Sequence, residues 1–143
     1  MPYPEEMVAP MRHELASLGI DELKTADAVD NFIGENAPSA MIVINSVCGC
    51  AAGSARPAVA MAMQHENKPV RIGTVFAGND VDAVAKVRSL TPDVPPSSPS
   101  VLLLKDGKPA GFIPRHVFES TDPNGVSEVL KDAFAQLFGG QEG

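Results

Sequence analysis

Residues 39–62 read SAMIVINSVCGCAAGSARPAVAMA, and this stretch decides the fold. It begins with an apolar run, MIVI, which lacks polar alternation and is typical of a short strand buried on both faces at the centre of a parallel sheet. A Cys-Gly-Cys motif follows at Cys48, Gly49 and Cys50, and small residues then recur at helical spacing. The stretch therefore predicts a strand, a turn with two thiols, and a helix that is kinked at Pro57 or starts after residue 51.

The other elements follow from similar patterns on either side. Apolar residues recur every three or four positions in residues 7–18 and 28–33, which predicts two helices. Later patterns predict strands over 70–76, 101–104 and 110–113, an Asp106-Gly107 hairpin turn, and helices over 81–90 and 126–138, the last starting near Asp122-Pro123. We expect one α/β domain over residues 1–143, in which N-terminal helices (1–37) precede a βαβαββα core (38–138) with a central mixed sheet.

The composition is that of an ordinary globular protein. Hydrophobic residues make up 44% of the 143 residues and charged residues 20%, which excludes disordered and fibrous classes. The net charge of −7, without a cluster of Lys and Arg, argues against a nucleic-acid partner. No apolar run approaches the ~20 residues that span a bilayer. The acidic start MPYPEEMVAPM does not have the layout of a secretory signal, so we expect no membrane partner and a cytoplasmic location.

The chain contains two cysteines, Cys48 and Cys50, and such a pair in a reducing compartment is more often chemical than structural. At a strand–helix junction, unpaired backbone N–H groups and the helix dipole stabilise a thiolate. Cys48 is therefore expected to be the attacking thiolate with a lowered pKa and to be the more exposed of the two cysteines, and Cys50 to be more covered. Gly49 leaves room for a bulky thiol to approach. No strong cation is expected beside Cys48, because Arg56 lies about 12 Å further along a helix.

Two other roles for the thiols stay open. Either cysteine could be a small residue of the core. Alternatively, a non-catalytic homodimer could bind a metal ion or an iron–sulfur cluster, because two sulfurs supply only half of a tetrahedral shell and His13, His65 and His116 lie on separate elements. For His116 beside Arg115, an exposed solvated pair is favoured over a role near the thiolate.

Pro99 directly precedes the third predicted strand, where the loop must pass close to the cysteine turn. Only about 5–6% of X-Pro bonds in folded proteins are cis. The order of the elements favours a cis Ser98-Pro99 bond here, because a strand, a cysteine pair at the start of a helix and this proline together resemble the thioredoxin fold. That fold implies a three-layer α/β/α arrangement in which the cis-proline loop faces the reactive sulfur.

More narrowly, the sequence resembles the bacilliredoxins, thioredoxin-like proteins with a Cys-Gly-Cys signature. The matching segments are spread in the expected order over residues 5–116. They are EEMVAPMRHEL, VINSVCGCAAGSARPA, TVFAG, PPSSPS, LKDG and IPRH. The combination of NSVCGCA with PPSSPS is specific, whereas Cys-x-Cys alone would be a weak signal.

The resemblance implies a thiol–disulfide oxidoreductase that removes bacillithiol, or a similar low-molecular-weight thiol, from S-thiolated proteins. Cys48 matches the attacking cysteine, Cys50 the second cysteine and Pro99 the cis-proline. We expect Gly49, Ser98 and Pro99 to contact the substrate, and we expect neither a cofactor nor a metal ion. A homodimer is left open.

Overall fold

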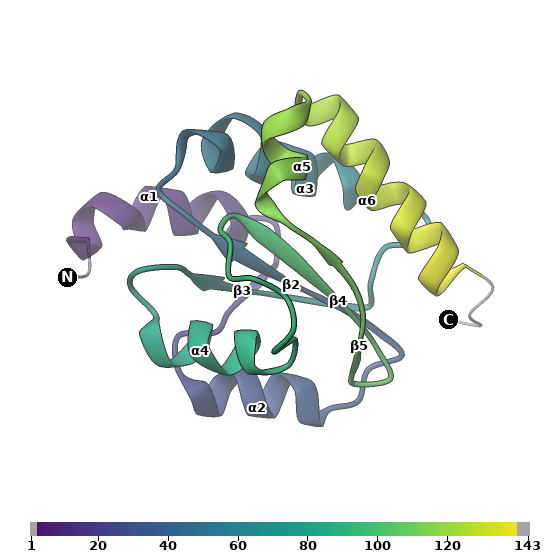
Figure 1. The fold of residues 1–143 in the computed structure, drawn as a ribbon, viewed down its shortest axis with the longest axis horizontal. Helices are drawn as coiled ribbons and strands as arrows, with labels where there is room; N and C mark the ends of the chain where they lie inside the picture. The colour runs from purple at the N-terminus through teal and green to yellow at the C-terminus, as the bar shows by residue number, and fades with distance from the viewer. Residues whose placement is uncertain (1–2, 140–143) are drawn as a thin grey trace.

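A computed structural model describes residues 3–139, in which five strands form a sheet between two layers of helices (Figure 1). None of the helices within this range combines the length and the apolar character needed to cross a membrane. In chain order the elements are α1 (Glu5–Ala16), β1 (Asp21–Glu22), α2 (Ala26–Gly34), β2 (Ser39–Asn45), the π-helical turn η1 (Ala51–Ala55), α3 (Arg56–Ala62), β3 (Arg71–Phe76), α4 (Val81–Ser89), β4 (Ser100–Lys105), β5 (Lys108–Ile113), α5 (Arg115–Ser120) and α6 (Pro123–Phe138).

The sheet is mixed, with the strand order β1-β3-β2-β4-β5. Strands β1, β3 and β2 run parallel, whereas β4 pairs antiparallel with both β2 and β5. Helices α2 and α4 cover one face of the sheet, and α1, α3, α5 and α6 lie over the other (Figure 1). The predicted three-layer α/β/α fold with a central mixed sheet is therefore confirmed.

Strand β2 is the centre of this arrangement, and all seven of its residues are buried. Met41 and Val43 point into the core under α3 and α6, whereas Ile42 and Ile44 join the core under α2 and α4. Because both faces are covered, neither set of side chains can be polar. This explains the uninterrupted MIVI run.

Helix α6 follows its predicted stripe. Val126, Leu130, Phe134 and Phe138 are buried at a spacing of four residues and pack against the sheet and α3. At the start of the helix, the side chain of Asp122 accepts a hydrogen bond of 2.9 Å from the backbone N–H of Gly125. The predicted start at Asp122-Pro123 is confirmed.

Two elements were not predicted, and both are short. Strand β1 lies between the two N-terminal helices and adds an edge strand beside β3, but both of its residues are exposed. Helix α5 follows β5 directly and buries only Phe118. Neither element carries enough apolar residues for periodicity to reveal it.

The β4–β5 hairpin turns at Asp106 and Gly107, which have φ values of 53° and 81°. Positive φ at both central residues is what a tight hairpin turn requires, and Asp-Gly provides it at little cost. Strand β5 begins at Lys108, two residues earlier than predicted, because its first residues are exposed and give no apolar pattern. A register shift between Leu103 and Leu104 then interrupts its pairing with β4.

Replacing Phe134 by Ala tests the core under α6. The ring is fully buried, so Phe134→Ala should lower the free energy of unfolding by about 3–5 kcal/mol. Gln136→Ala, on the exposed side of the same helix, should change it by less than about 0.5 kcal/mol. Chemical denaturation of both variants measures the difference, and equal values would contradict the packing of α6.

Candidate active site

The cysteine turn lies where β2 leaves the sheet and the helical segment η1–α3 begins. The backbone N–H of Cys48 donates to Ser46 Oγ at 3.0 Å, and the carbonyl of Cys48 accepts from Ala51 N at 3.0 Å. The motif is thus tied to the end of the strand on one side and to the first helical turn on the other. Pro57 falls in the first turn of α3, directly after η1, so the predicted kink or late start is confirmed.

The two thiols are free, half-buried and in contact, with their Sγ atoms 2.9 Å apart. The hydrogen bond from the Cys50 thiol lowers the pKa of Cys48, and the backbone N–H groups of Cys50 and Ala51 lower it further. Burial raises the pKa of Cys50, and the neighbouring Cys48 sulfur adds to that increase. The arrangement therefore favours a thiolate at Cys48 and a protonated thiol at Cys50. Gly49 between them is exposed, with open space where a Cβ atom would lie.

Arg115 corrects the expectation that no strong cation lies near Cys48. Its positive charge lowers the pKa of both cysteines, and the two sulfurs in turn raise the pKa of Arg115. Arg115 is the first residue of α5, 67 positions after Cys48 along the chain. The chain reaches it through the β4–β5 hairpin, which returns to the same end of the sheet. Its neighbour His116 is exposed, as expected.

Arg115 also contacts the loop that precedes β4. Its Nη1 lies 3.4 Å from the carbonyl oxygen of Ser98, and its backbone N–H donates to Ser97 Oγ at 3.3 Å. The Ser98-Pro99 bond is cis, as predicted, and Pro99 is buried whereas Ser98 is half-buried. Arg115 thus connects this loop with the two cysteines. Direct packing of Pro99 against Cys48 stays a prediction.

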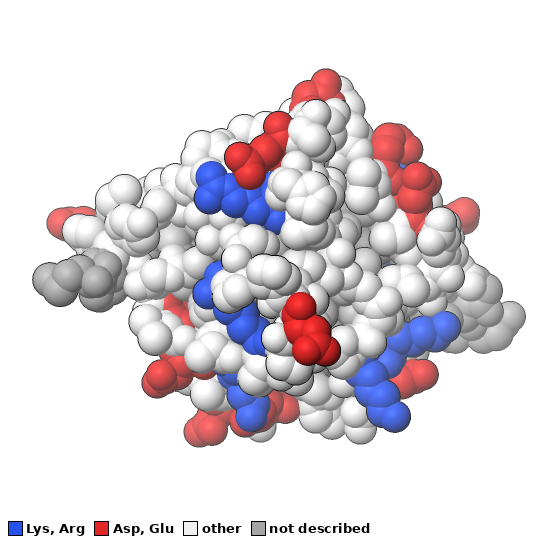
Figure 2. All heavy atoms as spheres, in the orientation of Figure 1, with Lys and Arg blue, Asp and Glu red and all other residues white. Residues whose placement is uncertain are grey.

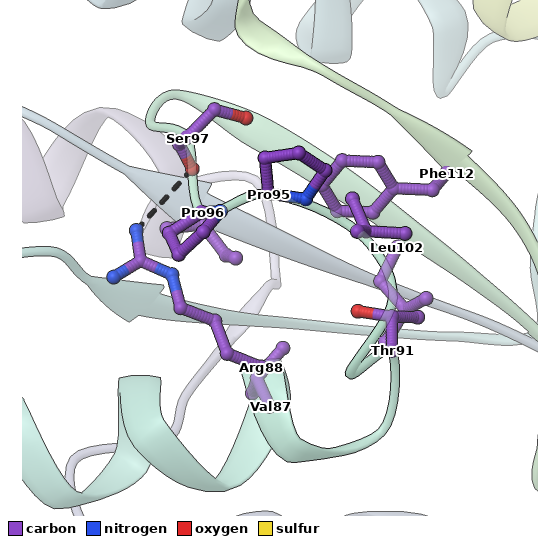
Figure 3. A pocket seen from close by; sticks show the side chains of 10 residues that line it. Val87, Arg88, Thr91, Pro95, Pro96, Ser97, Leu102 and Phe112 are labelled. Carbon is purple, nitrogen blue, oxygen red and sulfur yellow. Dashed lines mark hydrogen bonds between the residues drawn. The ribbon is translucent and has the colours of Figure 1, made fainter.

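The same loop is held from the other side by α4. Arg88 Nη2 donates to the carbonyl of Ser97 at 3.3 Å (Figure 3). Pro95 lies beside the ring of Phe112, and both residues line, together with Pro96, a cavity of only about 10 Å³ (Figure 3). The loop is therefore anchored rather than free.

Arg56 binds the residues that lead into the cysteine turn and does not contact the sulfurs. Its side chain is only 4% exposed, and its Nε donates to Glu14 at 2.7 Å. Its Nη1 donates to Asn45 Oδ1 at 2.9 Å and to the Ser46 carbonyl at 3.0 Å. Asn45 Nδ2 in turn donates to the carbonyl of Met11 in α1. The network joins α1, α3 and the end of β2 at Asn45 and Ser46, and Ser46 in turn bonds the backbone N–H of Cys48. It was not predicted.

Among residues 3–139, no three His, Cys, Asp or Glu side chains are grouped so that they could hold a metal ion. His13 lies at the end of α1, His65 follows α3 and His116 lies on α5. A metal or cluster at Cys48 and Cys50 would therefore need ligands from a second chain.

The lowered pKa of Cys48 predicts a pH profile for its alkylation. Because the thiolate is the reactive form, the rate should rise as pH increases through the folded pKa, with a midpoint below the free-thiol value of ~8.5. Arg115→Met should move this midpoint upward, whereas Arg71→Met, beside the opposite end of β2, should leave it unchanged. Peptide masses after iodoacetamide treatment separate Cys48 from Cys50. A midpoint at or above ~8.5 would disprove the activated thiolate.

The Arg56 network predicts a second effect, for which Arg12 is the matched control. Both arginines are buried, but Arg12 pairs with Glu5 and Asp80 and, unlike Arg56, makes no hydrogen bond to Asn45 or Ser46 at the start of the cysteine turn. Arg56→Met should cost about 1–3 kcal/mol of unfolding free energy and raise the alkylation midpoint of Cys48.

Arg12→Met leaves the buried Asp80 without its cation, so it should cost more, about 3–5 kcal/mol, yet keep the midpoint of the unmodified chain. Denaturation curves and alkylation profiles of both variants measure the two quantities. Equal midpoints in the two variants would show that Arg56 contributes to stability alone.

This chain is similar to proteins of a known family. Residues 3–138 match the protein family described as Disulphide isomerase. A bacilliredoxin of Cytophaga hutchinsonii is 47% identical over 135 residues, covering 94% of this chain and 99% of the relative. A bacilliredoxin of Shouchella clausii is 46% identical, covering 92% of this chain and 91% of the relative.

Among solved structures, thioredoxin of Fasciola hepatica superposes with a TM-score of 0.60 at 19% identity. The match covers 82% of this chain and 99% of that thioredoxin, and at this identity it shows the fold. Fold, family and the paired thiols at the end of β2 lead to the same conclusion. The chain belongs to the bacilliredoxin family of thioredoxin-fold thiol–disulfide oxidoreductases.

Proposed function

We propose that this protein removes a low-molecular-weight thiol, bacillithiol or one like it, from mixed disulfides on cytoplasmic proteins. The observation that carries the proposal is the pair of sulfurs 2.9 Å apart whose pKa values are shifted in opposite directions. Such a pair supplies a nucleophile, Cys48, and beside it a protonated thiol, Cys50, which can act in a later step. No cofactor is needed for the exchange.

In the first step, the Cys48 thiolate attacks the sulfur of the small thiol within the mixed disulfide. A bond forms between Cys48 and the small thiol, the original S–S bond breaks, and the protein cysteine leaves as a thiolate that takes up a proton from solvent. Gly49 gives the incoming disulfide room, and we assign Ser98 and Pro99 to the wall of the substrate site. Arg115 stabilises the attacking thiolate before the transfer.

Release of the small thiol then follows one of two routes. Cys50, once deprotonated, can attack Cys48, which expels the small thiol and leaves a Cys48–Cys50 disulfide that an external dithiol or two thiols must reduce. Alternatively, an external thiol attacks the sulfur of the small thiol in the Cys48 adduct, forms a disulfide with it, and releases Cys48 as its thiolate. Because one residue separates the cysteines, we expect the external route to compete with the internal one.

The two cysteines should therefore respond differently to substitution. With a bacillithiolated or otherwise S-thiolated test protein, Cys48→Ser should abolish removal of the thiol. Cys50→Ser should retain the first transfer and accumulate an adduct on Cys48, detected by intact mass. If Cys48→Ser still removed the thiol and Cys50→Ser did not, Cys50 would be the attacking residue and Cys48 the second cysteine. Activity in both variants would show that neither thiol is catalytic.

The same variants separate the oxidoreductase from a metal-binding homodimer. Stoichiometric metal or a visible cluster spectrum in anaerobically purified protein, lost in Cys50→Ser, would contradict the proposal. The intact mass of protein purified from its native host identifies the small thiol by the mass it adds to Cys48.

A further inference from the structure

A groove of about 600 Å³ opens between the loop before β4 and helix α5. Helix α5 also contacts η1, the helical turn that directly follows Cys50, so the groove lies at the cysteine end of the sheet. One wall is apolar and is built from Val94, Pro95, Pro96 and Phe112. The other wall is α5, which presents Arg115, His116 and Glu119. The volume lies within the range of small-molecule sites, ~300–1,000 Å³, and is modest for an extended protein segment.

Arg115 lines this groove and is the first residue of α5, the helix that contacts the helical turn after Cys50. Its charge interacts with both Cys48 and Cys50. Its Nε is bonded to Glu119 at 3.1 Å and its Nη1 makes a long contact of 3.4 Å with the Ser98 carbonyl. Within residues 3–139, Nη2 has no hydrogen-bond partner, so the guanidinium keeps donors for a ligand.

The positive charge at the groove is confined to α5. The chain as a whole carries −7, so a general attraction for anions is not expected. Over α5, basic and acidic side chains lie next to each other beside a largely uncharged surface (Figure 2). Among the described residues that line the groove, Arg115 is the one Lys or Arg, and its charge interacts with both Cys48 and Cys50.

We propose that the groove holds the small thiol during transfer and that Arg115 binds a carboxylate of that thiol. The inference rests on the proposed function, because it places the small thiol on Cys48. Guanidinium donors suit a planar carboxylate, and a carboxylate a few bonds from the sulfur lies within reach of a cation that also acts on the sulfur. The site thereby favours acidic thiols over neutral ones.

The test compares two thiols that differ only in this charge. A test protein with one cysteine is S-thiolated either with N-acetylcysteine or with its amide, and release by the unmodified chain is measured for each. The acid should be released with a higher kcat/KM than the amide. In Arg115→Met this preference should fall roughly two- to fivefold, the size expected for a partly exposed ion pair.

The ratio of the two substrates isolates binding from reactivity, because the loss of Arg115 alters the Cys48 thiolate equally for both. Glu119→Gln removes the carboxylate that competes for Arg115, so it should increase the preference for the acid. Arg71→Met, a charge-matched substitution at the opposite end of the sheet, should leave the preference unchanged. High salt should weaken the preference in the unmodified chain.

Three results would overturn the assignment. If the unmodified chain releases acid and amide equally, the carboxylate is not bound and the proposed function stands without this site. If the preference survives in Arg115→Met, another group binds the carboxylate. A second test protein carries Asn in place of an Asp next to its cysteine. If this change lowers release and the charge of the small thiol does not, Arg115 contacts the protein substrate. If neither adduct is released, the proposed function itself fails.

Discussion

The burial of β2 on both faces is the constraint on which the active site depends. The strand pairs with β3 on one edge and β4 on the other, and all of its residues are shielded from solvent. A slip of one residue would exchange the side chains of the two cores, so the register is strongly fixed. The chain leaves the sheet at Asn45, and the position of Cys48 three residues later is set by the most constrained strand in the molecule. A rigid strand thus carries a turn whose thiols remain accessible.

The chemistry depends on keeping the two thiols unequal. Identical side chains two residues apart would share a similar pKa in water, but here burial penalises the charged form of Cys50 while hydrogen bonds stabilise that of Cys48. Arg115 favours the thiolate at both positions, and Glu119 opposes it at Cys50. The local order of the pKa values therefore comes from the turn itself, and α5 adjusts it.

The sequence predicts this molecule best where a local pattern is strong. The buried strand β2, helix α6 and the Asp106-Gly107 turn were all evident from local pattern, and so was the cysteine pair. β1 and α5 were missed because both are short and mostly exposed. Arg115 was missed as a neighbour of Cys48 because a contact across 67 positions leaves no local pattern. The segment IPRH, part of the family resemblance, was the one signal that could have directed attention to it.

Three arginines near the cysteine end of the sheet show how partners determine what a cation can do. Arg12 and Arg56 are buried; Arg12 is bound by two carboxylates, and Arg56 by one carboxylate and two further polar groups. These bonds hold secondary-structure elements together and leave neither arginine available to a substrate. Arg115 is 44% exposed, with one carboxylate partner and long contacts to the loop. Releasing it from Glu119 costs little, because exposed ion pairs contribute at most about 1 kcal/mol. Of the three, Arg115 alone combines proximity to the sulfurs with donors that a substrate can use.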